Sequence, residues 1–87
     1  MKVSTTHSAV IGETTIGTGG PWILTLPAPV QYGFVGFVNA NAASGTITVH
    51  TPSGILYNIT QATGDIAFAP TKTASFRSDG TNWYQVA

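Results

Sequence analysis

Apolar and polar residues alternate along most of this chain in short runs that glycine and proline interrupt. No stretch sustains the spacing of an amphipathic helix, and β-branched and aromatic residues dominate between the breaks. Short strands at such regular intervals are typical of an all-β fold, here a small antiparallel β-sandwich or a jelly-roll-like barrel. The pattern predicts strands at residues 22–26, 30–39, 45–50, 55–60, 64–69, 72–77 and 82–86.

The longest predicted strand is apolar on both faces. Val35 and Phe37 lie on one face, and the other carries Val30, Tyr32, Phe34 and Val38. Both faces of such a strand must be packed against other protein atoms. The domain core supplies one cover, and either a second subunit or loops of the same chain supply the other. Gly33 and Gly36 in this strand predict a bulge or a close approach of another backbone.

The chain ends in a predicted hairpin. Asp79-Gly80 is a strong signal for a two-residue type I′ turn, because both central residues of that turn need a positive φ. Aromatic pairs across such a hairpin stabilise it by about 0.2–1 kcal/mol relative to alanine pairs. Phe76, Asp79, Gly80 and Trp83 are therefore interpreted as a structural hairpin. In the predicted register, three pairs of residues lie opposite each other across the hairpin: Phe76 with Trp83, Ser75 with Tyr84, and Arg77 with Asn82.

The first 20 residues differ from the rest. They are polar, end in glycine-rich sequence and have weak strand character only around Ala9–Ile11. We predict an N-terminal arm over residues 1–20 and a β-sandwich domain over residues 21–87. The arm is either a frayed terminus or single edge strand, or a strand that reaches onto a neighbouring molecule.

The composition adds that the chain carries very little charge. Its 87 residues include no cysteine, the formal net charge is zero, and only 7% of the residues are charged, whereas about 25% is usual in soluble domains. A domain of this size without disulfides is marginal as a monomer. Much of the surface is therefore predicted to be covered, by self-association or by docking onto a larger assembly.

The cations and the apolar runs exclude two classes of partner. Lys2, Lys72 and Arg77 are scattered, so no phosphate-tracking patch is predicted and nucleic acid is not an expected partner. No apolar run approaches the roughly 18 residues of a membrane span, and the N-terminus lacks the apolar core of a secretory signal. We expect a protein made in a cytoplasm, with no membrane partner.

No catalytic or metal site assembles from the residue spacing. Glu13, Asp65, Asp79, His7 and His50 are far apart, and no pair of them has the spacing of metal ligands. No nucleophile motif is present, and the glycine-rich stretch near residue 18 lacks the lysine of a phosphate loop. We expect no enzyme activity, no cofactor and no metal ion.

The aromatic residues allow a sugar-binding interpretation, because ring faces stack on the apolar faces of sugars. For most of them, packing in the core or against another subunit is the simpler explanation, and Tyr84 is the least explained by the predicted hairpin. The candidates are Trp22, Tyr32, Tyr57, Trp83 and Tyr84.

Three segments carry a resemblance to a known group of proteins. WILTLP, GFVNANAASGTITVHTPSG and SFRSDGTNWYQV resemble a small trimeric β-domain of tailed-phage structural proteins, found in capsid decoration (cement) proteins, head fibres and tail-fibre tips. The resemblance covers about residues 21–87. Arg77 departs from the apolar residue expected there, and residues 58–70 match only loosely.

The resemblance implies a homotrimer that binds another virion surface or a cell surface. A chain this short, with no shaft, favours a decoration protein that binds the major capsid protein on the outside of the shell and stabilises it. One alternative is a tail-fibre tip or spike module that recognises a bacterial glycan through Tyr84, Tyr57 or Trp22, and another is a small structural protein elsewhere in the virion, such as a tail or neck component. Localisation on the capsid surface of the virion follows from the first hypothesis.

Within the decoration hypothesis, the N-terminal arm is the candidate capsid contact and the doubly apolar strand contributes to the trimer interface. The interface candidates are Val35, Phe37 and Tyr84. The capsid-contact candidates, within residues 1–12, are Lys2, Val3, Ser4, Thr5, Thr6, His7 and Val10.

Overall fold

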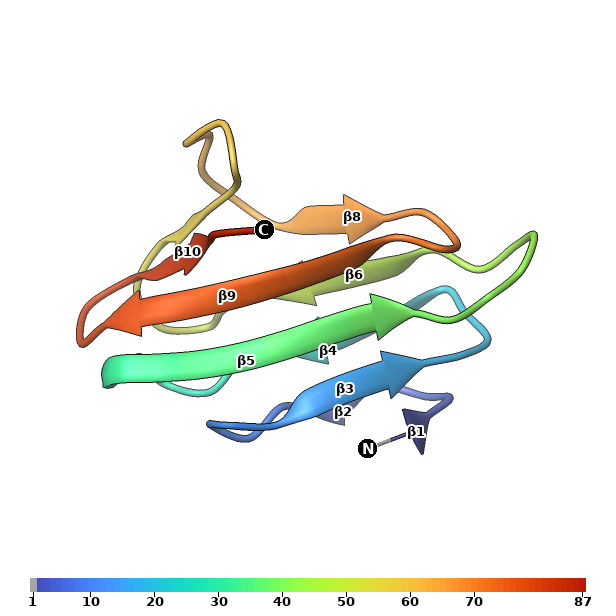
Figure 1. Ribbon diagram of the computed structural model, residues 1–87, viewed down its shortest axis with the longest axis horizontal. Helices are drawn as coiled ribbons and strands as arrows, with labels where there is room; N and C mark the ends of the chain where they lie inside the picture. The colour runs from blue at the N-terminus through green and yellow to red at the C-terminus, as the bar shows by residue number, and fades with distance from the viewer. Residues whose placement is uncertain (1) are drawn as a thin grey trace.

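The computed structural model describes residues 2–87, which form ten β-strands and no helix. Six strands form one sheet in the order β1 (Lys2–Val3), β3 (Thr14–Gly17), β5 (Gln31–Asn39), β9 (Thr73–Asp79), β10 (Trp83–Gln85) and β7 (Leu56–Tyr57). The other four form a second sheet in the order β2 (His7–Ser8), β4 (Trp22–Thr25), β6 (Ile47–His50) and β8 (Ile66–Phe68). The all-β prediction is confirmed, and each predicted strand has a counterpart in β4 to β10 (Figure 1).

The prediction of purely antiparallel sheets is wrong. The pairs β1–β3, β3–β5, β2–β4, β4–β6 and β7–β10 are parallel, whereas β5–β9, β6–β8 and β9–β10 are antiparallel. The reason lies in the winding of the chain, which passes from one sheet to the other at every step from β1 to β9. Each return to a sheet follows a crossover through the other sheet, and a parallel pair requires such a long crossover.

Over the described residues, the predicted arm at residues 1–20 is not a free segment, and its edge-strand alternative comes closest, with one edge strand in each sheet. β1 and β3 pair with each other and β3 pairs with β5, while β2 pairs with β4 in the second sheet. The Ala9 amide donates a hydrogen bond to the Thr25 carbonyl at 2.8 Å, and the Ala9 side chain is buried. Residues 2–17 are therefore built into both sheets, and Ala9–Ile11 form no strand of their own.

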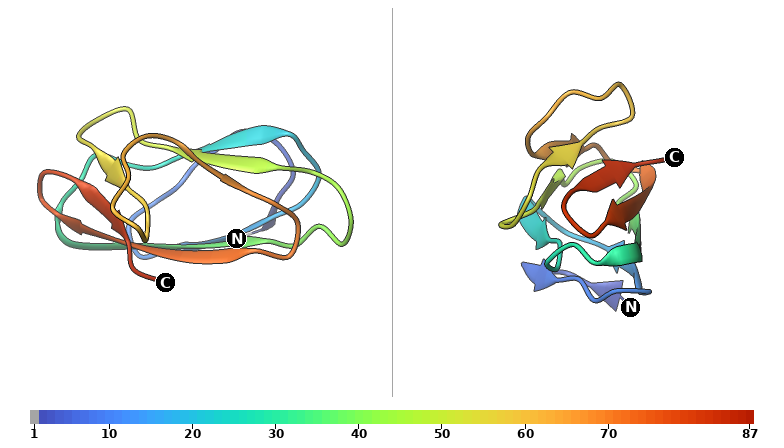
Figure 2. Two further views of the ribbon diagram at one scale, coloured as in Figure 1. Left: turned by 90° about the horizontal axis from the view of Figure 1, so that it is seen from above. Right: turned by 90° about the vertical axis from the view of Figure 1, so that its left-hand side faces the viewer.

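The hydrophobic core lies between the two sheets, which face each other as two layers (Figure 2). The ring of Phe68, from the four-stranded sheet, contacts Phe37 and Phe76 of the six-stranded sheet, with centroids 5.4 and 6.2 Å apart. The indole of Trp83 is fully buried, and its N–H donates to the Pro27 carbonyl at 2.9 Å. The core comprises Ala9, Trp22, Leu24, Leu26, Val35, Phe37, Ile47, Val49, Leu56, Phe68, Ala74, Phe76 and Trp83.

The C-terminal hairpin forms, but its predicted register is shifted by two residues. Ser78 lies opposite Trp83, and the two-residue loop is Gly80-Thr81. Only Gly80 needs a positive φ, of +94°, as in a turn with glycine at its first central position. A shift of two preserves which face each side chain occupies, so Phe76 and Trp83 both lie in the core, as predicted.

A side-chain hydrogen bond explains the shift. The Asp79 carboxylate accepts from the amides of Thr81 and Asn82, each at 2.9 Å. An aspartate whose carboxylate accepts a hydrogen bond from the backbone amide two residues later stabilises a turn in which the aspartate is the first residue. Asp79 therefore precedes the loop instead of occupying it.

Candidate functional site

A row of large side chains crosses the outer face of the six-stranded sheet. Phe34 of β5 lies opposite Arg77 of β9, Arg77 lies opposite Tyr84 of β10, and Tyr84 lies opposite Tyr57 of β7. Residues opposite each other on neighbouring strands point to the same face of a sheet. We call Phe34, Arg77, Tyr84 and Tyr57 the aromatic row.

Each member of the aromatic row contacts its neighbour or lies directly beside it. The guanidinium carbon of Arg77 lies 4.6 Å from the centroid of the Phe34 ring, a cation–π contact that contributes about 0.5–1 kcal/mol at an exposed site. The rings of Tyr57 and Tyr84 are stacked, with centroids 5.1 Å apart and planes 6° from parallel. The row is therefore ordered, although it lies on the surface and Tyr57 and Tyr84 are only half-buried.

Asp79 connects the aromatic row to the hairpin turn. Its Oδ2 accepts a hydrogen bond from the Tyr84 hydroxyl at 3.0 Å, while its Oδ1 accepts from the two turn amides. The backbone hydrogen bonds from Asn82 and Thr81, with a smaller contribution from Tyr84, lower the pKa of Asp79. The carboxylate is thus a fixed, ionised hydrogen-bond acceptor beside the tyrosine rings.

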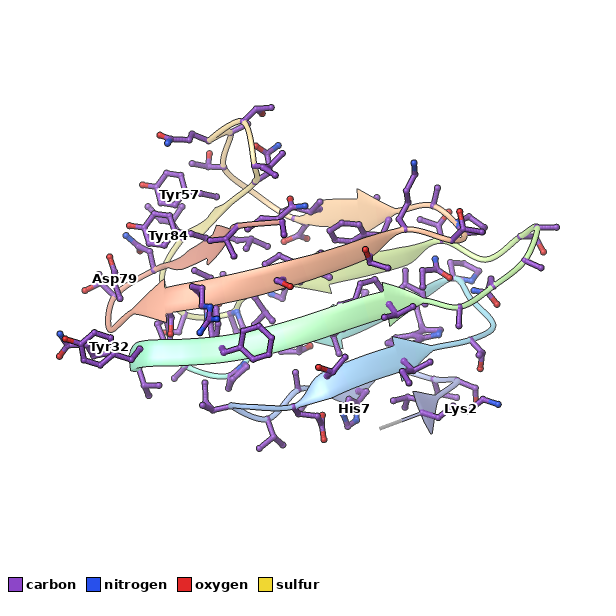
Figure 3. The ribbon with its side chains drawn as sticks, viewed as in Figure 1. Lys2, His7, Tyr32, Tyr57, Asp79 and Tyr84 are labelled. Atoms are coloured by element: carbon purple, nitrogen blue, oxygen red, sulfur yellow. The ribbon has the colours of Figure 1, made fainter. Side chains whose placement is uncertain are left out.

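Tyr32 lies at the same end of the sheet. The register of β5 against β9 slips between Gln31 and Gly33, which leaves Tyr32 in a bulge with φ of +62°. Its side chain is 87% exposed. Bulges of this kind turn a side chain away from its regular direction, and Figure 3 shows Tyr32, Asp79, Tyr84 and Tyr57 at one end of the molecule.

A shallow hollow adjoins the aromatic row on the same face. Gly36 lines the hollow, and a larger residue does not fit at this position, because a Cβ there would lie 2.6 Å from Thr14 Oγ1, which is too close for two atoms that are not bonded. The bulge between Gln31 and Gly33 confirms one of the two alternatives predicted for the glycines of the strand, whereas the close neighbour of Gly36 is the Thr14 side chain and not another backbone. The hollow has a volume of about 180 Å³ and is lined by Thr14, Phe34, Gly36, Phe37, Val38, Thr73, Ala74, Ser75 and Ala87.

The predicted trimer-interface residues are only in part on the surface. Val35 and Phe37 are 0% and 1% exposed and lie in the core, so their side chains cannot contact a second copy while the chain keeps this fold. The outward face of β5 carries Phe34 and Val38 instead. Tyr84 does lie on the outer face, in the aromatic row.

The predicted capsid-contact residues lie together along one edge of the molecule. β1 is the outermost strand of the six-stranded sheet and β2 is the outermost strand of the four-stranded sheet. Figure 3 shows Lys2 and His7 along this edge, far from the labelled tyrosines. Ser4, Thr5, Thr6 and Val10 are exposed, whereas Val3 and His7 are half-buried. We call residues 2–11 the N-terminal edge.

A hydrogen bond between His7 and Glu13 joins the two layers at the N-terminal edge. His7 Nε2 lies 3.0 Å from Glu13 Oε1, and Glu13 immediately precedes β3. This hydrogen bond from His7, more than any other contact, lowers the pKa of Glu13. The interaction holds β2 against the start of β3 and gives this edge a defined shape.

The other titratable groups do not converge on one site. His50 Nδ1 lies 2.7 Å from Asp65 Oδ1 on the exposed side of the four-stranded sheet. Within residues 2–87, no group of three or more histidine, aspartate or glutamate side chains could hold a metal ion. The same part of the chain holds no helix long and apolar enough to span a bilayer.

The structure sorts the aromatic residues that the sequence singled out. Trp22 and Trp83 are buried in the core, whereas Tyr32, Tyr57 and Tyr84 reach the surface. Sequence reasoning missed Phe34 and Arg77 as members of the surface row, because the row depends on strand register. The one available signal was the departure at Arg77 from the apolar residue that the resemblance predicts.

Comparison of this chain with known protein families, curated proteins and solved structures finds no match. The two surfaces, the aromatic row with Tyr32 and the N-terminal edge, are therefore interpreted from their own chemistry.

Proposed function

We propose that this chain is a capsid decoration protein, a small β-sandwich module that binds the outside of a viral shell as a homotrimer and stabilises it. The observation that carries the proposal is a surface on which each of the three acidic side chains lies beside a side-chain partner and the exposed residues are largely apolar or small and polar. The resemblance of residues 21–87 to phage structural modules supports the same interpretation.

Each acidic side chain of the sequence lies within hydrogen-bonding distance of another side chain. Glu13 faces His7, Asp65 faces His50, and Asp79 accepts hydrogen bonds from Tyr84 and the turn amides. Burying an unpaired charge against a partner is costly, whereas a charge that keeps its partner costs much less. These three acidic groups can therefore be covered by another protein at a lower cost than carboxylates without partners.

Exposed apolar side chains are distributed over the surface instead of forming one patch. A protein that contacts both its own copies and a shell needs apolar area on more than one side. The exposed aliphatic residues are Val10, Ile11, Ile16, Ile23, Val30, Ile55, Ile59 and Val86.

The N-terminal edge is the proposed contact with the major capsid protein. Its strands β1 and β2 leave one side of each sheet without a neighbouring strand, and such edges are available for pairing with another chain. Val10 adds an apolar side chain there. The contact between copies is proposed on the outer face of the six-stranded sheet, where Ile16 and Val38 lie opposite each other.

Stabilisation of the shell follows from mass action. A protein that binds the assembled shell and not its separated subunits stabilises the shell by RT ln(1 + [L]/Kd) at every site. Three N-terminal edges in one trimer would bind together, so that weak single contacts sum to tight attachment. On this proposal the protein is made in the cytoplasm of the bacterial host and resides on the virion surface.

Imaging of particles with and without the protein tests the proposal. We expect added density at threefold positions of the shell and a higher temperature of shell disruption when the protein is present. Val10→Asp should lose shell binding, and Ile59→Asp is the matched control because Ile59 is similarly exposed, at 60% against 58% for Val10. Absence of density on the shell, or equal binding by both variants, would refute the proposal.

A further inference from the structure

Three tyrosines and one carboxylate gather at the end of the sheet opposite the N-terminal edge. Tyr57 lies on β7, which is the outermost strand on that side, and Tyr84 and Asp79 lie on the neighbouring hairpin. Tyr32 reaches the same end from the bulge in β5 (Figure 3). We call Tyr32, Tyr57, Tyr84 and Asp79 the tyrosine end. Its position does not depend on the proposed shell contact.

The conformation of Tyr32 points to binding more than to folding. A positive φ is unfavourable for a bulky residue and persists only where the surrounding structure imposes it. Here it presents to solvent a ring that is 87% exposed and so contributes little to the core. Bulges that redirect a side chain are over-represented beside functional sites.

Tyr57 and Tyr84 add two further rings in a fixed arrangement. Stacking between them, with centroids 5.1 Å apart, and the hydrogen bond from the Tyr84 hydroxyl to Asp79 limit their motion. The Tyr57 hydroxyl makes no hydrogen bond within residues 2–87 and is available to a ligand. A tyrosine of this kind offers an apolar body and a polar tip at little entropic cost.

Asp79 decides which ligand chemistry suits these rings. Its carboxylate is ionised and held by two turn amides, so its position is fixed before any ligand arrives. The ligand must therefore bring hydrogen-bond donors together with an apolar face. Proline-rich peptides offer the apolar face but few donors, and an ionised nucleic-acid phosphate brings hydrogen-bond acceptors but no donor for the carboxylate of Asp79.

A sugar ring satisfies both requirements. One face of a pyranose presents C–H groups, which the partial negative charge of an aromatic face attracts, and its rim presents hydroxyl donors for Asp79. We propose that the tyrosine end binds the pyranose rings of a neutral glycan. Arg77, held over Phe34 in the same row, lies beside the rings and can donate to further sugar oxygens.

Titration with defined sugars, followed by NMR of the full chain, tests this site. The probes are soluble hexasaccharides of glucose, galactose and N-acetylglucosamine, with a decaproline peptide as the competing ligand class. We expect saturable shifts at Tyr32, Tyr57 and Tyr84 with at least one hexasaccharide and none with decaproline. Tyr57→Ala should weaken that binding about tenfold, as loss of one stacked ring implies.

Two variants separate loss of binding from loss of folding. Tyr84→Phe keeps the stacked ring but removes the hydroxyl that contacts Asp79, so it should fold and bind more weakly than wild type. Ile23→Ala alters an exposed residue on the outer face of the other sheet and should bind normally. No saturable binding to any hexasaccharide, equal binding by Tyr57→Ala, or shifts only with decaproline would overturn the inference. None of these results tests binding to the viral shell, which is tested separately with the Val10→Asp variant.

Discussion

Asn39 is a buried polar residue on which a whole region of the fold depends. Its side chain is inaccessible to solvent at the end of β5. Its amide nitrogen donates to the Phe68 carbonyl at 3.0 Å and to the Gly45 carbonyl at 2.9 Å. Its side-chain oxygen, Oδ1, accepts hydrogen bonds from the backbone and side-chain nitrogens of Asn41. These bonds link the six-stranded sheet to β8 and to the loop over residues 40–45.

Replacing Asn39 with alanine should destabilise the protein strongly. The buried Phe68 carbonyl would lose its side-chain donor, and an unsatisfied buried acceptor costs about 1–3 kcal/mol. The three other bonds are part-buried, and each contributes about 0.5–1.5 kcal/mol when intact. Because water can replace some of them, we expect a total loss near 4 kcal/mol. That is a large share of the roughly 4–13 kcal/mol available to a domain of this size.

Urea unfolding followed by tryptophan fluorescence measures the loss, because Trp22 and Trp83 are both buried and report on the core. Asn58→Ala is the matched control: Asn58 also accepts several hydrogen bonds, from Thr60 and Ala62, but in an exposed loop. We expect the control to lose about 1 kcal/mol or less. If Asn39→Ala unfolds at the same urea concentration as Asn58→Ala, the account of the buried network is wrong.

Three further predictions follow from the same structure. Trp83→Ala should cost about 4 kcal/mol, the usual loss for a buried tryptophan, as measured by thermal melting with the remaining tryptophan as the probe. Gly80→Ala places a side chain at φ of +94° and should cost about 1 kcal/mol, whereas an unchanged melting temperature would contradict the revised turn. The folded-state pKa of Glu13 lies below its ordinary value of 4.5. Glu13 therefore contributes stability that is fully present above that value and is lost as the pH falls through the lowered folded-state pKa. In Glu13→Gln, the free energy of unfolding should therefore fall less steeply as the pH is lowered than it does in the wild type. Parallel plots of unfolding free energy against pH for the two proteins would show that the contact with His7 does not contribute to acid stability.

The positions of most strands could be predicted from the sequence, because their signals are local. Glycine and proline interrupt the chain at fixed places, and β-branched and aromatic residues fill the intervals between them. The strands β4 to β10 coincide with those intervals. The same local pattern correctly predicted that Phe76 and Trp83 share the core face, since side chains alternate along a strand whatever its partner is.

The strands near the N-terminus could not be predicted in this way. β1 and β2 contain two residues each, which is too short for any alternation to be recognised. They exist because β3 and β4 present open edges to them. Tertiary pairing therefore determined their conformation, and the polar composition that suggested a free arm instead reflects strands at the rim of both sheets.

The candidate site was only partly visible in the sequence. Tyr32, Tyr57 and Tyr84 could be named as surface aromatics, but their gathering at one end could not be inferred. It required a bulge in β5, a parallel pairing of β10 with β7, and a turn register set by the Asp79 side chain. Each of these depends on contacts between residues that are distant in the sequence or on one hydrogen bond.

By itself, then, the order of residues determined which segments form β4 to β10 and which side chains of one strand share a face, because both depend on neighbours within a few positions. The tertiary structure alone decided which strands lie side by side and in which direction they run. It also decided that Val35 and Phe37 face the core while Phe34 faces outward. The physical reason is that a strand apolar on both sides has no local preference between them, so the packing of the second sheet makes the choice.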